Sequence, residues 1–382
     1  MRPDEIYLDH AASTPMCPEA VEAMLPWLTH AGNPSGSHRP ARDARRAIDE
    51  ARESLAELTG FGPSAIVFTS GGTEADNLIV SGRHDEVGGR ILCSAIEHPA
   101  ILEPAQAVGA TTVAVRTDGR VDLDALCACL DAGVTLVSVM AVNNEIGVIE
   151  PLDLVAEVVR ANAPNAALHT DAVQALPWID LRPIGALVDA MSLSAHKFGG
   201  PKGVGLLALD PVAQIAPRQR GGGQEHERRS GTHNVAGIVA MAAAARVVDT
   251  LRSREVPRVA ALRDRLVAGV LARLDDVVET AVTMPGDRSH VIAGNAHLCF
   301  RGVESEALLF LLDEAGVCAS AASACASGAQ HPSHVLEAIG IDRDLAGGSL
   351  RLSLGYATTE SEVDRAIDAV VASVERLRTY CR

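Results

Sequence analysis

The stretch Ser194-Ala195-His196-Lys197-Phe198-Gly199-Gly200-Pro201-Lys202-Gly203 holds both lysines of this 382-residue chain. Every other member of its 33 lysines and arginines is an arginine. Arginine keeps its proton near neutral pH, whereas a lysine can act as an amine nucleophile and form a Schiff base with a carbonyl cofactor. A compositional bias against lysine would explain the pair about equally well, so the interpretation depends on the residues around it.

The stretch follows one of several short apolar runs that alternate with helical segments. Strand-like runs lie at 65–69, 90–94, 111–115, 134–142, 167–170, 190–194 and 204–209. Helices are expected at 17–29, at 40–58, from Gly72, from about Pro99 and after Pro151. This alternation predicts βαβ units, and therefore a mostly parallel sheet with helices on both faces. Residues 234–275 predict two helices, and a smaller α+β unit is expected from about residue 290.

Composition narrows the class of protein. Hydrophobic residues make up 47% of the chain and aromatic residues only 3%, which suits an α/β core of Ala, Val, Leu and Ile. The formal net charge of -16 argues against a broad electrostatic contact with nucleic acid or an anionic membrane. The most apolar run, Val235 to Val248, is too short to cross a bilayer, and Met1 to Glu5 lacks an apolar signal region. A cytoplasmic protein is therefore expected.

The cysteines indicate free thiols. Eight of them are scattered along a long chain, unlike the disulfide framework of a small secreted domain. Cys127 and Cys129 have the spacing of half a metal site, but no matching Cys or His pair accompanies them. No metal is expected.

Three segments at predicted strand ends together indicate a cofactor site. Gly72 and Thr73 open a helix directly after a strand, where free N–H groups and the helix dipole favour a phosphate. Asp171 ends an apolar strand and would keep the nitrogen of a cofactor ring protonated. Lys197 follows the next strand and would form the Schiff base. A phosphate turn, an acid and a lysine at strand ends of one sheet predict a pyridoxal phosphate site.

Two further polar segments lie at strand ends and are ambiguous by themselves. His98, in Glu97-His98-Pro99, could stack on a flat ring, act as a base or be structural. The amides of Asn143-Asn144-Glu145-Ile146-Gly147 could bind a carboxylate or a cofactor oxygen, or form an ordinary polar turn. Neither segment alone decides between its functional and its structural interpretation.

The chain resembles the cysteine desulfurases, in the class V aminotransferase group of pyridoxal phosphate enzymes, nearly from end to end. The motifs that carry this resemblance are Tyr7-Leu8-Asp9-His10-Ala11-Ala12, Gly32-Asn33-Pro34-Ser35 with His38, Phe68 to Glu74, Asn143 to Gly147, Asp171 to Gln174, Ser194 to Lys197, Gly221 to Glu225, Arg229 to Thr232, Ser323 to Ser327 and Arg351 to Gly355. The resemblance implies a fold-type I transferase with a large cofactor-binding domain at 15–255. The small domain would combine 1–14 with 256–382 and carry a catalytic loop at about 319–332.

The resemblance also implies residue roles. Lys197 would be the Schiff-base lysine, His98 would stack on the ring and shuttle protons, and Asp171 would pair with the ring nitrogen. The resemblance also implies Gln174 at the ring hydroxyl and Asn144 between the ring and the substrate. The phosphate would be bound by Gly72, Thr73, Ser194 and His196, and by Thr232 of the neighbouring subunit in a homodimer. The substrate carboxylate would be bound by Arg351 with Asn33. The planar fork of an arginine matches a carboxylate.

Cys325 distinguishes this reaction from those of related enzymes. It lies in Ala319-Ser-Ala-Ala-Ser-Ala-Cys325-Ala-Ser-Gly-Ala-Gln330, where small neighbours predict an exposed, flexible loop of the kind found in the long-loop branch of the family. A buried free cysteine, the usual alternative, would have larger apolar neighbours. The resemblance implies that Cys325 takes sulfur from L-cysteine as a persulfide, leaves L-alanine and passes the sulfur on.

The sulfur acceptor stays open at this point. An iron–sulfur scaffold, tRNA thiolation and DNA phosphorothioation all remain, and the acidic charge favours a protein acceptor. Some long-loop relatives carry a further C-terminal tail that docks the scaffold protein, and the sequence here ends at Arg382. Rival functions are a selenocysteine lyase or another class V lyase, and a sulfur-binding scaffold without catalysis. The presence of both Lys197 and Asp171 argues against the scaffold.

Overall fold

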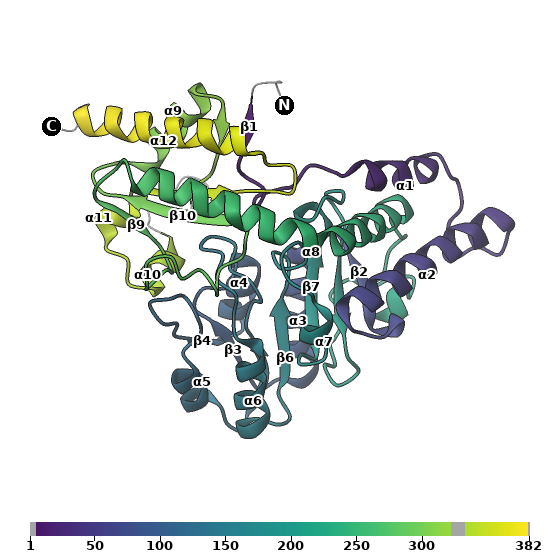
Figure 1. Ribbon diagram of the computed structural model, residues 1–382. Coiled ribbons are helices and arrows are strands. Elements are labelled where there is room, and N and C mark those ends of the chain that lie inside the picture. The colour runs from purple at the N-terminus through teal and green to yellow at the C-terminus, as the bar shows by residue number, and fades with distance from the viewer. Residues whose placement is uncertain (1–4, 322–332, 381–382) are drawn as a thin grey trace.

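A computed structural model describes residues 5–321 and 333–380. Its centre is a seven-stranded sheet in the order β2-β8-β7-β6-β5-β3-β4 (Figure 1). The strands are β2 (Ile66–Thr69), β3 (Arg90–Ser94), β4 (Thr111–Val113), β5 (Val134–Ser138), β6 (Ala167–Asp171), β7 (Ala190–Ser194) and β8 (Gly205–Leu209). Only β8 runs antiparallel to its neighbours, β2 and β7, so the predicted mostly parallel sheet is confirmed.

The strands are buried because both faces of the sheet are covered. Successive side chains of a strand point to opposite faces, and in β8 Leu206 and Ala208 join one hydrophobic core while Leu207 and Leu209 join another. The first core also contains α2 (Arg39–Thr59), α6 (Leu152–Asn162) and part of α8 (Val235–Leu271). The second contains α3 (Gly72–Val87) and α4 (Pro99–Ala107). The sheet is thus the middle layer of three.

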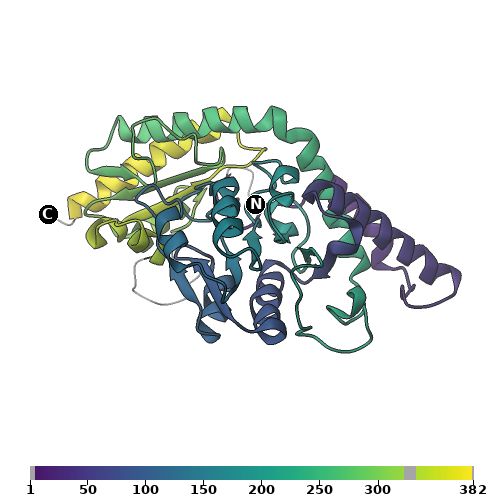
Figure 2. The same cartoon turned by 90° about the horizontal axis from the view of Figure 1, so that it is seen from below.

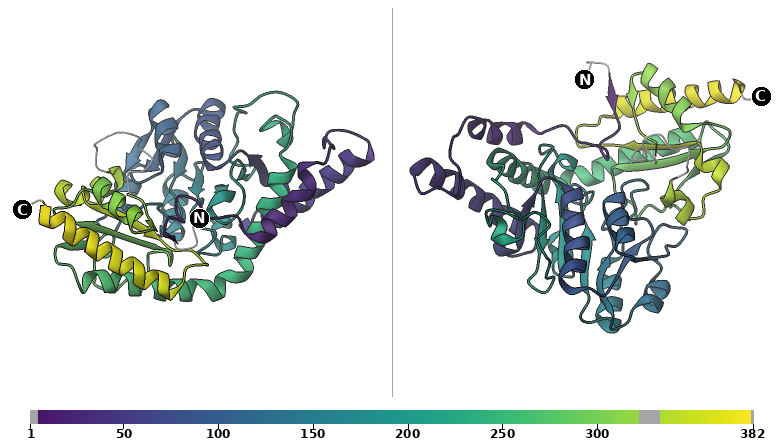
Figure 3. Two further views of the ribbon diagram at one scale, coloured as in Figure 1. Left: turned by 90° about the horizontal axis from the view of Figure 1, so that it is seen from above. Right: turned by 180° about the vertical axis from the view of Figure 1, so that it is seen from behind.

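A smaller unit lies beyond one edge of this layered unit, as Figures 1 and 3 show. It has an antiparallel sheet in the order β12-β10-β9 and a parallel pair, β1-β11. Its elements are β1 (Ile6–Tyr7), β9 (Val277–Glu279), β10 (Asn295–Phe300), α9 (Ser305–Glu314), β11 (Val317–Cys318), α10 (His334–Ala338), α11 (Arg343–Ala346), β12 (Ser349–Ser353) and α12 (Glu360–Tyr380). The N-terminal strand therefore pairs with a strand more than 300 positions later in the chain.

The helix α8 connects the two units. The sequence predicted two helices over 234–275, but the structure has one helix of 37 residues (Figure 2). Its first half, as far as Val248, packs in a core of the large sheet, and its second half, from Val259, packs in the core of the smaller unit. Pro257 lies between these halves, where the missing N–H interrupts the backbone hydrogen bonds but both flanks are held by packing.

Other elements differ from the predictions in their ends or were not expected. The apolar run 134–142 is a strand only as far as Ser138, and the remainder leads into the polar turn at Asn143. The short helix α5 (Leu123–Cys129) was not predicted, and Asp122 caps its first turn. The remaining helices are α1 (Pro18–Leu28) and α7 (Arg182–Gly185). Among the described residues, no helix is both long and apolar enough to span a membrane.

The two units meet around Trp178. Its ring packs edge-on against that of Tyr356, with centroids 5.8 Å apart, and the Tyr356 hydroxyl donates a hydrogen bond to the Pro177 carbonyl. Gly294 of the smaller unit lies so close to Trp178 that a Cβ atom there would come within 2.1 Å of ring atom Cζ2. A side chain at residue 294 would therefore push the units apart.

We predict that Gly294→Ala lowers the free energy of unfolding by about 1–3 kcal/mol, the usual cost of overpacking. Gly62→Ala is the matched control, because a Cβ atom at Gly62 meets nothing within 4 Å. Thermal and urea unfolding of both variants measure the difference. Equal stability of the two variants would contradict this account of the contact between the units.

Candidate functional site

One cavity of about 600 Å³ opens at the carboxyl ends of the parallel strands. The segments that follow β2, β3, β5, β6 and β7 all reach it, as is usual for ligand sites of open α/β sheets. It is lined by ten of the residues predicted from sequence: Gly72, Thr73, His98, Asn144, Asp171, Gln174, Ser194, His196, Lys197 and Arg351. The fold thus brings together residues spread over 280 positions of the sequence.

One end of the cavity is the N-terminus of α3. Its N-cap, Gly71, provides no side-chain cap, so the first N–H groups of the helix are left to bind a ligand at the cavity wall. Gly72 has to be a glycine, because a Cβ atom there would lie 2.7 Å from Cγ2 of Val173. Ser194 and His196 line the same cavity from the end of β7. This arrangement suits a phosphate group.

Asp171 ends β6 and is buried. Its Oδ1 accepts a hydrogen bond from the Val173 N–H at 2.8 Å. Burial raises the pKa of this carboxyl to about 6, and the Val173 N–H and the positive charge of Lys197 oppose that rise. A second positive group, such as a protonated ring nitrogen, would stabilise its ionised form further. Asp171 therefore suits the role of a ring-nitrogen partner.

Lys197 lies at the end of the short 3-10 turn Ala195–Lys197 that follows β7. Its Nζ donates hydrogen bonds to the carbonyls of Ala11 at 2.7 Å and Ala12 at 3.0 Å. Gln174 Nε2 donates to the same Ala11 carbonyl at 2.8 Å. The N-terminal segment thus holds the amine and the amide next to each other at one wall of the cavity.

His98 both caps α4 and lines the cavity, and the sequence did not distinguish these two roles. Its Nδ1 caps α4 by accepting from the Ala100 N–H at 3.1 Å, so in the neutral ring the proton is on Nε2. Burial, with help from the charges of Lys197 and His334, lowers the pKa of His98 to about 4. At neutral pH the ring that lines the cavity is therefore uncharged and has an Nε2–H donor.

Arg351 reaches the cavity from β12 of the smaller unit. It donates from Nη1 to the Asn144 carbonyl at 2.9 Å and from Nη2 to Asp9 Oδ1 at 3.0 Å. The side chain is buried, and its Nε has no hydrogen-bond partner among the residues that the structure describes. Arg351 also lines the cavity, where its guanidinium would suit a substrate carboxylate.

Three predicted residues are not in this cavity. Asn33 is exposed, and its Oδ1 accepts from the Ser35 N–H at 3.0 Å. Thr232 lines a separate cavity of about 110 Å³ together with Glu225 and Arg229. Cys325 lies outside the described residues, as does most of the predicted loop.

Sequence reasoning missed a set of buried acids around the cavity. Asp76, one helical turn after Gly72, is 1% exposed, and its Oδ1 lies 3.9 Å from His169 Nε2 with no hydrogen-bond partner among the described residues. Glu97 is fully buried and accepts from the Met140 N–H at 2.6 Å. Burial and the charge of Asp171 raise the pKa of both carboxyls well above the usual range. No local signal in the sequence marks them, because Asp76 lies between Glu74 and Asn77 and Glu97 is followed by His98.

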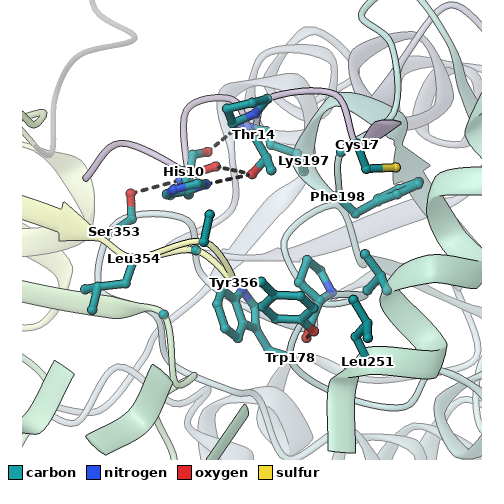
Figure 4. A pocket seen from close by; sticks show the side chains of 18 of the residues that line it. His10, Thr14, Cys17, Trp178, Lys197, Phe198, Leu251, Ser353, Leu354 and Tyr356 are labelled. Atoms are coloured by element: carbon teal, nitrogen blue, oxygen red, sulfur yellow. Dashed lines mark hydrogen bonds between the residues drawn. The ribbon is translucent and has the colours of Figure 1, made fainter. Parts of the chain in front are cut away.

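A second, apolar cavity of about 410 Å³ adjoins the first. Figure 4 shows Lys197 and His10 on one side of it and Trp178, Tyr356 and Leu251 on the other. Lys197 and Gln174 line both cavities, so the amine lies where they meet. Only the first cavity joins the lysine to Asp171, His98 and the start of α3, so we assign the chemistry to it.

The donors in the first cavity fit the predicted cofactor. Free helix N–H groups suit its phosphate, the buried Asp171 its ring nitrogen, and Lys197 its aldehyde carbon. No group of three or more potential metal ligands occurs within residues 5–321 and 333–380.

Known proteins resemble this chain along almost all of its length. It matches the class V aminotransferase family over residues 6–366. It is 44% identical over 387 residues to the IscS-like cysteine desulfurase of Mycobacterium tuberculosis, which covers 97% of both chains. Its fold is similar to that of a NifS-like protein, with a TM-score of 0.89 and 32% identity over 97% of this chain and 100% of the other. It also resembles SspA in complex with cysteine, with a TM-score of 0.77 and 28% identity over 92% and 99% of the two chains.

Buried acids make the stability of the protein depend on pH. Glu150 tests this best, because it does not line the cavity proposed to hold the cofactor and the substrate. It is 4% exposed and accepts from the Val121 N–H at 2.8 Å, and burial raises its pKa from 4.5 to about 8. The folded protein therefore holds this proton over a pH range in which the unfolded chain releases it. The protonated Glu150 carboxyl therefore contributes fully to the free energy of unfolding below about pH 4.5, and this contribution is lost as the pH rises through about 8.

We predict that Glu150→Gln, measured against the wild type, gains up to about 4 kcal/mol in stability between pH 5 and pH 9. The amide still accepts from Val121 but cannot ionise. Thermal unfolding of both proteins across this pH range measures the change. Glu57→Gln, at an exposed position, should follow the wild-type curve, and parallel curves for all three proteins would refute a raised pKa at Glu150.

Proposed function

This chain belongs to the cysteine desulfurases of the class V aminotransferase family, and we propose that it removes sulfur from L-cysteine with pyridoxal 5′-phosphate and holds it as a persulfide on Cys325. The observation that carries the proposal is the single cavity in which Lys197, Asp171 and Arg351 meet the start of α3. Those groups provide an amine, an acid, a carboxylate receptor and a phosphate site within one space.

Different residues of the cavity would bind the cofactor and the substrate, L-cysteine. The N–H groups at the start of α3, with Thr73, Ser194 and His196, hold the phosphate. Asp171 keeps the ring nitrogen protonated, and Gln174 and His98 orient the ring. When bound, the cofactor withdraws electrons from the substrate and makes its α-proton removable.

The substrate is held by its carboxylate. Arg351 binds it in place of part of its present contacts, and Asn144, whose carbonyl already accepts from Arg351, lies between ring and substrate. Asn33 is exposed on this chain and would act at the carboxylate only after a rearrangement or from a second subunit. The Lys197 amine takes the α-proton from the bound substrate and returns a proton to the carbon skeleton.

Sulfur transfer balances without any added oxidant. The Cys325 thiolate attacks the sulfur of L-cysteine, a sulfur–sulfur bond forms, and the carbon–sulfur bond breaks. The electron pair of that bond stays with the carbon skeleton, which takes up a proton and leaves as L-alanine. The described residues support this role, because Ser320, five positions before Cys325 in the sequence, pairs with the proposed carboxylate receptor Arg351.

We propose a protein as the acceptor of the persulfide sulfur, because the net charge of -16 opposes contact with nucleic acid. Recovery of the purified protein with bound nucleic acid and no protein partner would count against this acceptor.

We predict that Cys325→Ser retains the cofactor absorbance and still changes it on addition of L-cysteine, but loses release of sulfide and alanine in the presence of dithiothreitol by at least about a hundredfold. Removing the nucleophile blocks the step that breaks the carbon–sulfur bond. Cys127→Ser is the matched control, because Cys127 is an exposed thiol on α5, and it should react like the wild type. Sulfide release by Cys325→Ser would refute the persulfide route.

A homodimer with shared sites completes the proposal. Val21, Leu25 and Leu28 form one exposed apolar face of α1, with 39%, 57% and 59% exposure, which is unusual for a helix that faces only water. Thr232 lines its own small cavity in this chain and would reach the phosphate of the partner's cofactor. Both features support an arrangement in which each subunit completes the other's site.

We predict that Lys197→Ala and Thr232→Asp are each inactive alone but regain activity when they form mixed dimers. In a mixed dimer, one site combines the intact Lys197 of one subunit with the intact Thr232 of the other. Desulfurase activity after joint unfolding and refolding measures this, and the statistical ceiling is roughly a quarter of the wild-type value, because half of the dimers are mixed and each has one intact site. A mixture as inactive as its components would exclude the shared site.

A further inference from the structure

The residues on both sides of the segment 322–332 contact the walls of the cavity. On the N-terminal side, Ser320 pairs with Arg351 through two backbone hydrogen bonds, of 2.8 Å from the Arg351 N–H and 3.3 Å from the Ser320 N–H. One end of the segment is therefore attached to the strand that carries the proposed carboxylate receptor.

On the C-terminal side the attachment is made by side chains. Ser333 is the N-cap of α10, and its Oγ accepts from the N–H groups of Val335 at 3.1 Å and Leu336 at 3.4 Å. The same hydroxyl donates a hydrogen bond to Glu145 Oε2. Both side chains are buried, each residue being 6% exposed. Ser333 thus joins the first turn of α10 to the neighbour of Asn144.

Glu145 is itself held in place by the turn in which it lies. Asn143 Oδ1 accepts from the N–H groups of Glu145 at 2.9 Å and Ile146 at 3.0 Å. Burial raises the pKa of the Glu145 carboxyl to about 7, while the Ser333 hydroxyl and the charge of Arg351 lower it. A helix cap needs no buried carboxylate behind it, and burying one is costly unless it is hydrogen-bonded. The Ser333 hydroxyl therefore satisfies the buried Glu145 carboxyl as well as the N-terminus of α10.

His334 makes a second, parallel contact. Its Nε2 lies 3.0 Å from the Glu97 carbonyl oxygen, directly next to His98. The first two residues after the segment 322–332 therefore contact the two turns that carry Asn144 and His98. These turns belong to the large unit, whereas α10 belongs to the smaller one.

We propose that Ser333 is a positioning residue for sulfur transfer: its bridge between Glu145 and the start of α10 holds the residues that directly follow the segment of Cys325 against the cavity wall. The proposal rests on the proposed function, since it concerns the step in which Cys325 receives sulfur. Ser333 touches neither substrate nor cofactor, so it should affect that step and leave the binding of both unchanged.

The test is a single turnover of the holoenzyme with L-cysteine and no reductant, in which the persulfide on Cys325 is trapped by alkylation and measured by mass spectrometry. Ser333→Ala should form it about tenfold more slowly, the effect expected from losing one buried hydrogen bond. The cofactor absorbance change should keep its wild-type dependence on L-cysteine concentration. Ser333→Thr, which keeps the hydroxyl, should restore the rate to within about twofold.

Asp342→Ala is the control for loss of a helix cap alone. Asp342 caps the neighbouring helix α11 by accepting from the Asp344 N–H at 3.0 Å, and its side chain is exposed. This variant should form persulfide at the wild-type rate. Should Ser333→Ala fold poorly, Ser333→Gly removes the same hydroxyl at a position where glycine is tolerated, and the same tenfold loss is expected.

Three results would overturn the proposal. Persulfide formation by Ser333→Ala at the wild-type rate would show that the bridge has no positioning role. An equal loss of rate in Asp342→Ala would show that loss of any helix cap in this unit slows the step. If the wild-type protein forms persulfide on no residue or on another cysteine, the proposed function fails, and the positioning role fails with it.

Discussion

The burial of Asp171 at the end of β6 is the constraint on which the rest of the site depends. A carboxylate that is removed from water needs hydrogen bonds and a positive partner, or it takes up a proton. Asp171 has one N–H donor and the nearby charge of Lys197, and burial still raises its pKa to about 6. A protonated ring nitrogen would therefore be stabilised strongly at this position. The sheet places Asp171 at the cavity that is reached by the segments after five of its strands.

The buried groups around Asp171 are consistent with its need for a positive partner. Burial, together with the charge of Asp171, raises the pKa of the Asp76 and Glu97 carboxyls, so both favour their neutral forms next to Asp171. Below the site, His169 binds Ser138 and Ser192 at 2.9 and 3.0 Å, and burial lowers its pKa to about 3. A neutral hydrogen-bonded layer of this kind keeps the charge at the cavity and away from the core.

The smaller unit contributes the proposed carboxylate receptor, Arg351, and further contacts to the turns of the large unit. Arg351 reaches across to the Asn144 carbonyl, and Ser333 and His334 contact the turns at Glu145 and Glu97. Movement between the two units would change all of these contacts together, whereas the contacts that we propose between this chain and its own ring and phosphate lie within the large unit. The long helix α8 and the contact at Trp178 limit such movement. In the proposed function, recognition of the substrate carboxylate by Arg351 and the positioning role of Ser333 would therefore depend on the same interface.

The sequence by itself determined the fold class and most of the cavity wall. Apolar runs that end in Gly72, Asp171 or Lys197 are local patterns, and parallel strands bring their carboxyl ends to one edge, so these residues could be placed together without coordinates. The sequence did not reveal that residues 234–275 form one helix, because packing against two cores outweighs the local effect of Pro257. It also did not reveal the roles of Asp76, Glu97 and Glu145. Whether an acid is exposed or buried, and which partner it meets, depends on contacts between residues that are far apart in the chain, and only the tertiary structure decides them.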